Sequence, residues 1–150
     1  QIDTNFVYND TLLIQIQQSD IYIQSPKYFF PSEEAPILTH SGTSTTFEFK
    51  KITALPYVYL NEAFLKEDFA KQNVTLDSSK EITLENGNPG ILHYFSFTSN
   101  GKDFQRITLL TGDYHNTVWV DVSCLKQFFQ YMENLLVKSL KTVNYNSINK

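Results

Sequence analysis

One stretch of the chain holds three side chains of metal-ligand type. Asp113 and His115 are separated by one residue, and Asp121 follows further along. Carboxylates and imidazoles bind zinc, and a catalytic zinc site uses three such ligands with an open position for water. This spacing keeps open a small metal-dependent hydrolase. In the competing interpretation, Asp113 and His115 form a solvated turn and Asp121 ends a strand, and we predict no metal site on that basis.

Cys124 is the single cysteine and the chain's only thiol nucleophile. We expect it in the first turn of a helix, where the dipole lowers a thiol's pKa. A base is also needed, and no histidine is adjacent to Cys124 in sequence. The alternative is a small buried residue. The sequence contains no Gly-x-Ser-x-Gly, no His-Glu-x-x-His and no Gly-rich phosphate loop. We therefore predict no catalytic residue and no cofactor.

The elements that position these side chains follow from residue periodicity. Alternation predicts a strand over residues 90–98, with His93 in register with Phe95 and Phe97. We interpret His93 as a partly buried sheet histidine with a hydrogen-bonded nitrogen. Further strands are expected, in chain order, over residues 11–16, 21–26, 37–40, 45–52, 80–85, 104–111 and 115–122.

Turns and helices complete the predicted order. The pairs Asn86-Gly87 and Asn100-Gly101 indicate tight hairpins, because a type I′ turn needs positive φ at both central residues. A first helix is expected over residues 61–72 with Asn61 as N-cap. Apolar residues at helical spacing predict a second helix from Leu125 to Leu140, capped by Ser123.

This order predicts an α+β fold: an antiparallel meander packed against a C-terminal amphipathic helix, with a second, shorter helix. The 150 residues fit one domain, with a core over about residues 20–143 and flexible termini. We see no internal repeat and no linker. The apolar face of one antiparallel sheet would then be covered by the last helix.

Three segments carry a resemblance to a known family. They are Ile21-Tyr22-Ile23-Gln24-Ser25-Pro26, Glu81-Ile82-Thr83-Leu84-Glu85-Asn86-Gly87 with the meander after it, and Leu136-Val137-Lys138-Ser139-Leu140-Lys141-Thr142-Val143. With them the chain resembles the Mog/PsbP-like group, including its bacterial DcrB-like members. That group contains photosystem accessory subunits, a binder of a small GTPase and envelope lipoproteins. The resemblance implies a non-enzymatic binding scaffold, and it transfers no site residue to this chain.

Charge and composition limit the classes of partner that we expect for this chain. The net charge is −4 and Arg106 is the only arginine, so we expect no nucleic-acid partner. No apolar stretch approaches the roughly 20 residues needed to span a bilayer. The chain starts with Gln1, which we interpret as a mature secreted or periplasmic form after signal-peptide removal. A lipoprotein of the resembled group would carry a cysteine at this position.

Two aromatic clusters beside prolines are the predicted binding surface. Tyr28, Phe29 and Phe30 form the first, and Tyr57 and Tyr59 belong to the second, both in expected loops. The alternative is that they close the open end of the sheet. The predicted function is a secreted or cell-envelope accessory module that binds an unknown protein or a small hydrophobic ligand. The metal-dependent hydrolase and a cytosolic chaperone for apolar segments of a secreted protein remain as alternatives.

Overall fold

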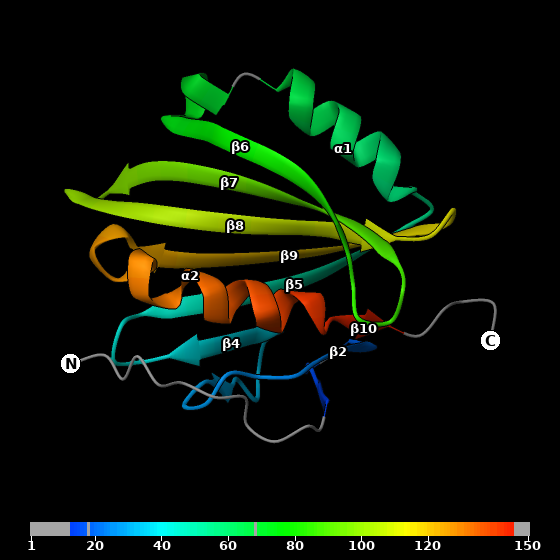
Figure 1. Ribbon diagram of the computed structural model, residues 1–150, viewed down its shortest axis with the longest axis horizontal. Helices are drawn as coiled ribbons and strands as arrows, with labels where there is room; N and C mark the ends of the chain where they lie inside the picture. The colour runs from blue at the N-terminus through cyan, green and yellow to red at the C-terminus, as the bar shows by residue number, and fades with distance from the viewer. Residues whose placement is uncertain (1–12, 18, 68, 146–150) are drawn as a thin grey trace.

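A seven-stranded antiparallel sheet forms the centre of the molecule in the computed structural model (Figure 1). The structure describes residues 13–17, 19–67 and 69–145. The strand order is β3-β4-β5-β9-β8-β7-β6. The strands are β3 (Phe30–Pro31), β4 (Ile37–His40), β5 (Thr45–Thr53), β6 (Val74–Thr83), β7 (Pro89–Ser99), β8 (Lys102–Gly112) and β9 (Asn116–Leu125). The predicted α+β meander is therefore confirmed.

The hairpin between β7 and β8 is the tight turn that Asn100-Gly101 predicts. Both residues have positive φ, 52° at Asn100 and 75° at Gly101, and Ser99 pairs directly with Lys102. Only a type I′ turn needs positive φ at both central positions, and its twist matches that of the strands. The turn sets the register between β7 and β8.

The connection between β6 and β7 differs from the prediction. The last paired residues are Thr83 and Pro89, and of the pair Asn86-Gly87 only Gly87 has positive φ. Gly87 N donates to Leu84 O at 2.9 Å, and Leu84 N donates to Asn88 O at 2.8 Å. This is a type I turn followed by a left-handed glycine, the three-residue alternative to the tight hairpin. The longer loop lets the buried Leu84 reach the core.

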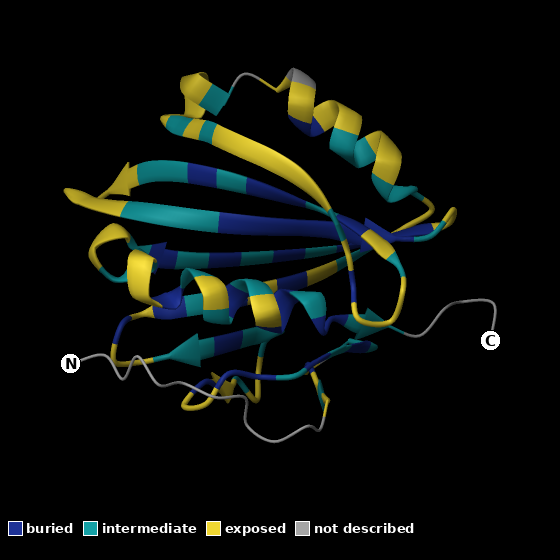
Figure 2. Cartoon of the chain, in the orientation of Figure 1, coloured by how far each residue is buried: buried dark blue, intermediate teal, exposed yellow. Residues whose placement is uncertain are grey.

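The C-terminal helix α2 (Lys126–Lys141) covers one face of the sheet. Met132, Leu136 and Leu140 are fully buried in one core cluster with the valines of β9. Figure 2 shows the central strands mostly buried and β6, at the edge, mostly exposed. Burying this apolar stripe is what keeps α2 on the sheet, because helical propensity alone stabilises a helix of this length only marginally.

The last helix begins at Lys126, one residue after the predicted start, but its predicted cap is wrong. Ser123 is not a cap, because β9 continues through Leu125, which is the N-cap and offers no side-chain hydrogen bond. Cys124 therefore belongs to a strand and pairs with Gln105 of β8. Pairing with β8 supplies hydrogen bonds to the backbone that a helix would otherwise have to satisfy.

The predicted first helix is two elements. Helix α1 spans Tyr57–Lys66 and begins after Pro56, and a separate 3-10 helix, η1, spans Phe69–Gln72. Asn61 thus lies inside α1 and is not its N-cap. Proline with its fixed φ suits the start of a helix. β6 then begins at Val74, earlier than the predicted 80–85, after Asn73 turns the chain with φ 60°.

A small second sheet closes the side of the molecule where the chain segments near the two ends meet (Figure 1). Its strands are β1 (Ile14–Gln15), β2 (Ile21–Ile23) and β10 (Asn144–Tyr145), with β2 in the middle. Ser139 Oγ of α2 donates to the carbonyl of Gln24 at 2.8 Å. Asn144, which the sequence places in a frayed tail, is therefore paired in a sheet. Of the predicted flexible ends, residues 1–19 and 144–150, the segments of β1 and β10 are ordered in this sheet. Residues 1–12, 18 and 146–150 of those ends lie outside the described residues.

Candidate functional site

A cleft of about 380 Å³ lies between α1 with η1 and the face of the sheet opposite α2. We call it the aromatic cleft. Successive strand residues point to opposite faces, so the residues beside the α2-facing valines of β9 face α1. The lining is Leu60, Ala63, Phe64, Glu67, Phe69, Gln72, Val74, Phe95, Arg106, Thr108, Trp119 and Asp121. Four strands and both short helices therefore contribute to one site.

Aromatic rings packed around Phe64 form the walls of the aromatic cleft. The ring centroid of Phe64 lies 5.1 Å from that of Trp119, 5.9 Å from Phe69 and 6.3 Å from Phe95, each in an edge-on arrangement. Edge-to-face pairs at these distances are favourable beyond their buried area. Leu110 and Phe95 are buried beneath Phe64 in the same cluster. Phe64 is thus the side chain that fastens α1 to the sheet.

Arg106 lies on the floor of the cleft and is held by neutral neighbours. Its Nε donates to Ser123 Oγ at 3.1 Å, and its guanidinium carbon lies 4.6 Å from the ring centroid of Phe97. Ser123 is its direct partner across β8 and β9, so the strand register makes this contact. An arginine stacked on an aromatic face keeps its planar set of terminal donors available for a ligand.

Asp121 is the second charged group on the floor. Thr108 Oγ1 and Trp119 Nε1 both donate to its Oδ1, at 2.5 and 2.9 Å. Two hydrogen bonds fix the orientation of the carboxylate. Trp119 is also covered by Lys50, whose Nζ lies 4.7 Å from the ring centroid. The floor of the cleft therefore presents both an anchored cation and an anchored anion.

Next to the cleft, His93 fastens α1 to the two outer strands. His93 is fully buried, its Nε2 donates to Asn61 Oδ1 of α1 at 2.7 Å, and Ser79 Oγ of β6 lies 2.6 Å from its Nδ1. The prediction of a hydrogen-bonded sheet histidine is confirmed, with greater burial than expected. A nucleophile, a base and an orienting amide occur in this order in some acyl-transfer enzymes. Here none of the three lines the aromatic cleft, and we assign the trio a structural role.

The burial of His93 makes the stability of the protein sensitive to acid. Burial lowers the pKa of His93, and also that of His40, from the ordinary value of 6.5. The unfolded chain then binds more protons than the folded one just below that value. We expect the free energy of unfolding to fall as the pH decreases from about 6.5 through the lowered pKa values. Denaturant unfolding between about pH 7.5 and pH 5 measures this slope.

His93→Gln isolates the contribution of this residue, because the glutamine amide can still donate to Asn61. The acid slope should become shallower, and His40 should supply what remains. His115→Gln is the matched control at an exposed position and should leave the slope as in the wild type. Equal slopes in the wild type and His93→Gln would contradict the assigned protonation state.

The residues of the possible metal site are used for other contacts. Asp113 Oδ1 accepts hydrogen bonds from the backbone N–H groups of His115 and Asn116, both at 2.8 Å, which is an Asx turn. Asp121 lies in the aromatic cleft and binds Thr108. Among the described residues, no group of three or more His, Cys, Asp or Glu side chains could hold a metal ion. The sequence spacing of Asp113, His115 and Asp121 thus does not bring them into one such group.

Cys124 faces the α2 side of the sheet and is buried in the main core. Burial raises the pKa of its thiol, although a side-chain hydrogen bond with Thr45 partly offsets the rise. The predicted lowering by a helix dipole is therefore wrong, because the residue lies in β9 and not in the first turn of α2. A thiol in this environment stays protonated at neutral pH. Its alternative description as a small buried residue is confirmed.

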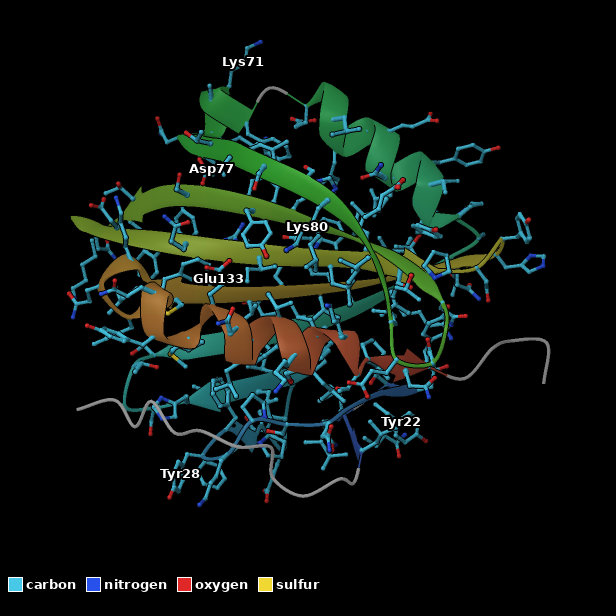
Figure 3. The ribbon with its side chains drawn as sticks, viewed as in Figure 1. Tyr22, Tyr28, Lys71, Asp77, Lys80 and Glu133 are labelled. Carbon is cyan, nitrogen blue, oxygen red and sulfur yellow. The ribbon has the colours of Figure 1, made fainter. Side chains whose placement is uncertain are left out.

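The five predicted binding residues do not form one surface. Tyr28 and Phe30 are exposed, whereas Phe29 between them is buried in the main core against Phe47. Tyr57 and Tyr59 lie in the first turn of α1 and not in a loop. Figure 3 shows Tyr28 at the opposite end of the view from α1. Binding at either aromatic cluster stays a prediction.

Tyr57, one of the five predicted binding residues, lines a second depression on the surface. A mostly apolar depression of about 320 Å³ lies between Pro56, Tyr57 and Val58 and the loop from β8 to β9. Tyr114 in that loop is 89 % exposed. Tyr57 also packs against the cluster of Phe64. The predicted aromatic residue therefore lies next to the aromatic cleft without lining it.

Sequence reasoning missed the residues that build the aromatic cleft. Arg106 appears there only as the single arginine, and Asp121 only as a possible metal ligand. The available signal is the register of the hairpin between β8 and β9, which pairs Arg106 with Ser123 and Thr108 with Asp121. Side chains of such pairs share one face and are neighbours. The register places the two floor charges together, but nothing in it indicates that α1 covers them.

Comparison with solved structures confirms the fold. Cyanobacterial PsbP (CyanoP) from Synechocystis sp. PCC 6803 aligns with a TM-score of 0.61 at 9% identity, covering 90% of this chain and 92% of that one. PA94, a protein of unknown function from Pseudomonas aeruginosa, gives 0.59 at 13% identity over 91% and 97%. LpqN of Mycobacterium tuberculosis, involved in cell envelope biogenesis, gives 0.57 at 11% identity over 95% and 91%.

These similarities establish the PsbP-like fold and no more, because unrelated functions share folds. No protein-family model matches the chain, and no curated protein matches its sequence. Within the described part of the chain, no helix is long and apolar enough to cross a membrane. The resemblance found in the sequence is thus confirmed at the level of fold.

Proposed function

We propose that this protein is a non-catalytic binding module and that the aromatic cleft holds a small ligand with an apolar part. The observation that carries the proposal is the cleft itself: about 380 Å³ of space walled by aromatic side chains, with polar groups of fixed orientation on its floor. Small-molecule sites typically combine a mostly apolar lining with a few placed polar groups. The aromatic cleft has this composition.

The roles of the reactive side chains support a binding role over a catalytic one. Cys124 is buried in the core, His93 uses both nitrogens to fasten α1, and Asp113 holds an Asx turn. None of these three residues lines the cleft. The lining therefore offers groups that hold and orient a ligand, and no Cys, His or Ser side chain is among them.

We extend the proposal to a location outside the cytoplasm, in the secreted or cell-envelope fraction. The support is the fold shared with LpqN, which is involved in cell envelope biogenesis, and with cyanobacterial PsbP. Fractionation of cells that express the gene from its native start tests this location. Recovery of the protein in the cytoplasmic fraction alone would contradict it.

The binding proposal is tested by filling the cleft. Ala63 lines the cleft from α1, and Ala63→Phe adds a ring there without removing a contact. Anilinonaphthalene sulfonate is a suitable probe, because Trp119 is the only tryptophan and lies in the cleft wall. Energy transfer from Trp119 to the bound probe reports binding, and its loss in the filled variant assigns the binding to this site. We expect the substitution to weaken binding at least about tenfold, equivalent to about 1.4 kcal/mol.

Ala70→Phe is the matched control, because Ala70 is exposed on η1 and does not line the cleft. Its affinity for the probe should equal that of the wild type. Thermal unfolding of both variants checks that the added ring has not displaced α1. Unchanged energy transfer in a folded Ala63→Phe protein would show that the probe binds elsewhere and would remove the cleft as the site.

A further inference from the structure

Two opposite charges lie in the aromatic cleft without pairing with each other. Arg106 and Asp121 occupy diagonal positions on β8 and β9. Diagonal neighbours on a sheet are about 7 Å apart at Cβ, which a long arginine side chain can span. Among the described side chains, however, no nitrogen of Lys, Arg or His lies within 4.0 Å of the Asp121 carboxylate. The charges are kept apart by the neutral groups that each one binds.

Each of the two charges has one occupied side and one available side. Arg106 uses Nε for Ser123, and its terminal nitrogens hydrogen-bond no described residue. Both hydrogen bonds to Asp121 end on Oδ1, so its Oδ2 accepts none from the described residues. A guanidinium presents paired donors to a carboxylate, and a carboxylate oxygen accepts from an ammonium. The cleft therefore offers separate positions for an anion and a cation.

Building on the binding function proposed above, we propose that the aromatic cleft recognises a free α-amino acid with an apolar side chain. The α-carboxylate binds the terminal donors of Arg106, and the α-ammonium donates to Asp121 Oδ2. The apolar side chain then lies against the rings of Phe64, Phe69 and Phe95, which pack on one another in the cleft wall. The volume of about 380 Å³ is at the small end for ligand sites, as a single amino acid requires.

Ligands with a single charge fit this floor less well. A ligand with only a carboxylate pairs with Arg106 but leaves the charge of Asp121 without a partner. A ligand with only an ammonium pairs with Asp121 but leaves the charge of Arg106 without a partner. Removing either charge of the protein from water without a partner is costly. Glu67 is the remaining charged group of the lining, and Gln72 Nε2 donates to its Oε1 at 3.1 Å. A zwitterion satisfies both floor groups at once.

The test uses the full chain with L-phenylalanine and three relatives, followed by calorimetry and by Trp119 emission. N-acetyl-L-phenylalanine lacks the ammonium, L-phenylalanine amide lacks the carboxylate, and L-phenylalanyl-L-alanine moves the two charges apart. We expect L-phenylalanine to bind and each relative to bind at least about tenfold more weakly. Equal affinity for the capped forms would overturn the proposal, and tighter binding of the dipeptide would assign the cleft to peptides instead.

Charge-removing variants localise the effect. Asp121→Asn keeps an oxygen for Thr108 and Trp119, and it should weaken the binding of L-phenylalanine at least about tenfold. It should not weaken the binding of N-acetyl-L-phenylalanine, because that ligand lacks the ammonium and the substitution removes the unpartnered charge that the ligand would face. Asp77→Asn is the matched control on β6, where Ser96 Oγ donates to Asp77 at 3.2 Å outside the cleft lining (Figure 3). It should leave both affinities unchanged.

The two proposals fail in different ways. If anilinonaphthalene sulfonate occupies the cleft but L-phenylalanine does not bind, the amino acid is overturned and the binding function stands. If Trp119 transfers no energy to anilinonaphthalene sulfonate, and L-phenylalanine does not shift the emission of Trp119, the proposed binding function is overturned as well. A loss of L-phenylalanine binding in Asp77→Asn equal to that in Asp121→Asn would show that the charges of the cleft floor do not select the ligand.

Discussion

Leu136→Ala is expected to lower the free energy of unfolding by about 2 to 5 kcal/mol. Leu136 is fully buried in the main core, where α2 meets β8 and β9. Removing its branched end deletes apolar contacts and leaves a cavity that close-packed neighbours fill only partly. Urea unfolding followed by far-ultraviolet circular dichroism measures the loss. The slope of the transition should stay constant if α2 remains on the sheet before unfolding.

Tyr131→Ala is the control for this experiment, because Tyr131 lies in the same helix and is 54 % exposed. Its effect should stay within about 0.5 kcal/mol of the wild type, as for most surface substitutions. Both variants also gain the helical propensity of alanine. A loss in Leu136→Ala no larger than in Tyr131→Ala would mean that α2 does not stabilise the sheet by burial.

The sheet and its roof were predictable because their patterns extend over many residues. Val118, Val120 and Val122 occupy every second position of β9, and all three are buried on the side of the sheet that α2 covers. The stripe from Leu125 to Leu140 recurs at helical spacing over several turns, and only the predicted cap, Ser123, is wrong. When apolar residues recur with the same period several times, they define one face of the strand or helix, and that face must be buried. The boundaries of an element depend on single residues. Here the pairing of Cys124 with Gln105 extends β9 up to the start of α2.

Helix α1 was predicted too late in the chain because its first turn has an ambiguous sequence. Tyr57-Val58-Tyr59 is aromatic and β-branched, which favours strands or exposed loops over helices. Tertiary contacts override this preference, since Tyr57 packs on the cluster of Phe64 against the sheet. The same contacts take Asn61 into the helix, where it binds His93. Local propensity is a weak guide where a helix is held by long-range packing.

The candidate site was the least predictable part for the same reason. Arg106 and Asp121 belong to different strands, and their meeting depends on the register of a hairpin. Phe64 comes from a helix that precedes both strands in the chain. Single-sequence patterns report which residues share a face, but not which distant element covers that face. The aromatic cleft therefore became visible only when the fold was known.

Phe64→Ala is expected to release α1 from the sheet and to open the aromatic cleft. Phe64 is 8 % exposed and contacts the rings of Phe69, Phe95 and Trp119. Deleting a buried phenylalanine typically costs about 3 to 5 kcal/mol. Because α1 contacts the sheet mainly at β8 and β9, we expect the loss to fall on the attachment of the helix. Hydrogen exchange of the α1 backbone should then become faster than that of β8.

Leu65→Ala is the matched control, since Leu65 is the next residue of α1 and is 58 % exposed. In Phe64→Ala the emission of Trp119 should shift to longer wavelength, because the ring beside the indole is lost and water reaches it. Affinity for anilinonaphthalene sulfonate should fall with it, whereas Leu65→Ala should keep both signals. If Phe64→Ala instead retains slow exchange in α1 and wild-type emission, the helix is held by His93 and Asn61 alone. The aromatic walls would then not be what preorganises the cleft for its ligand.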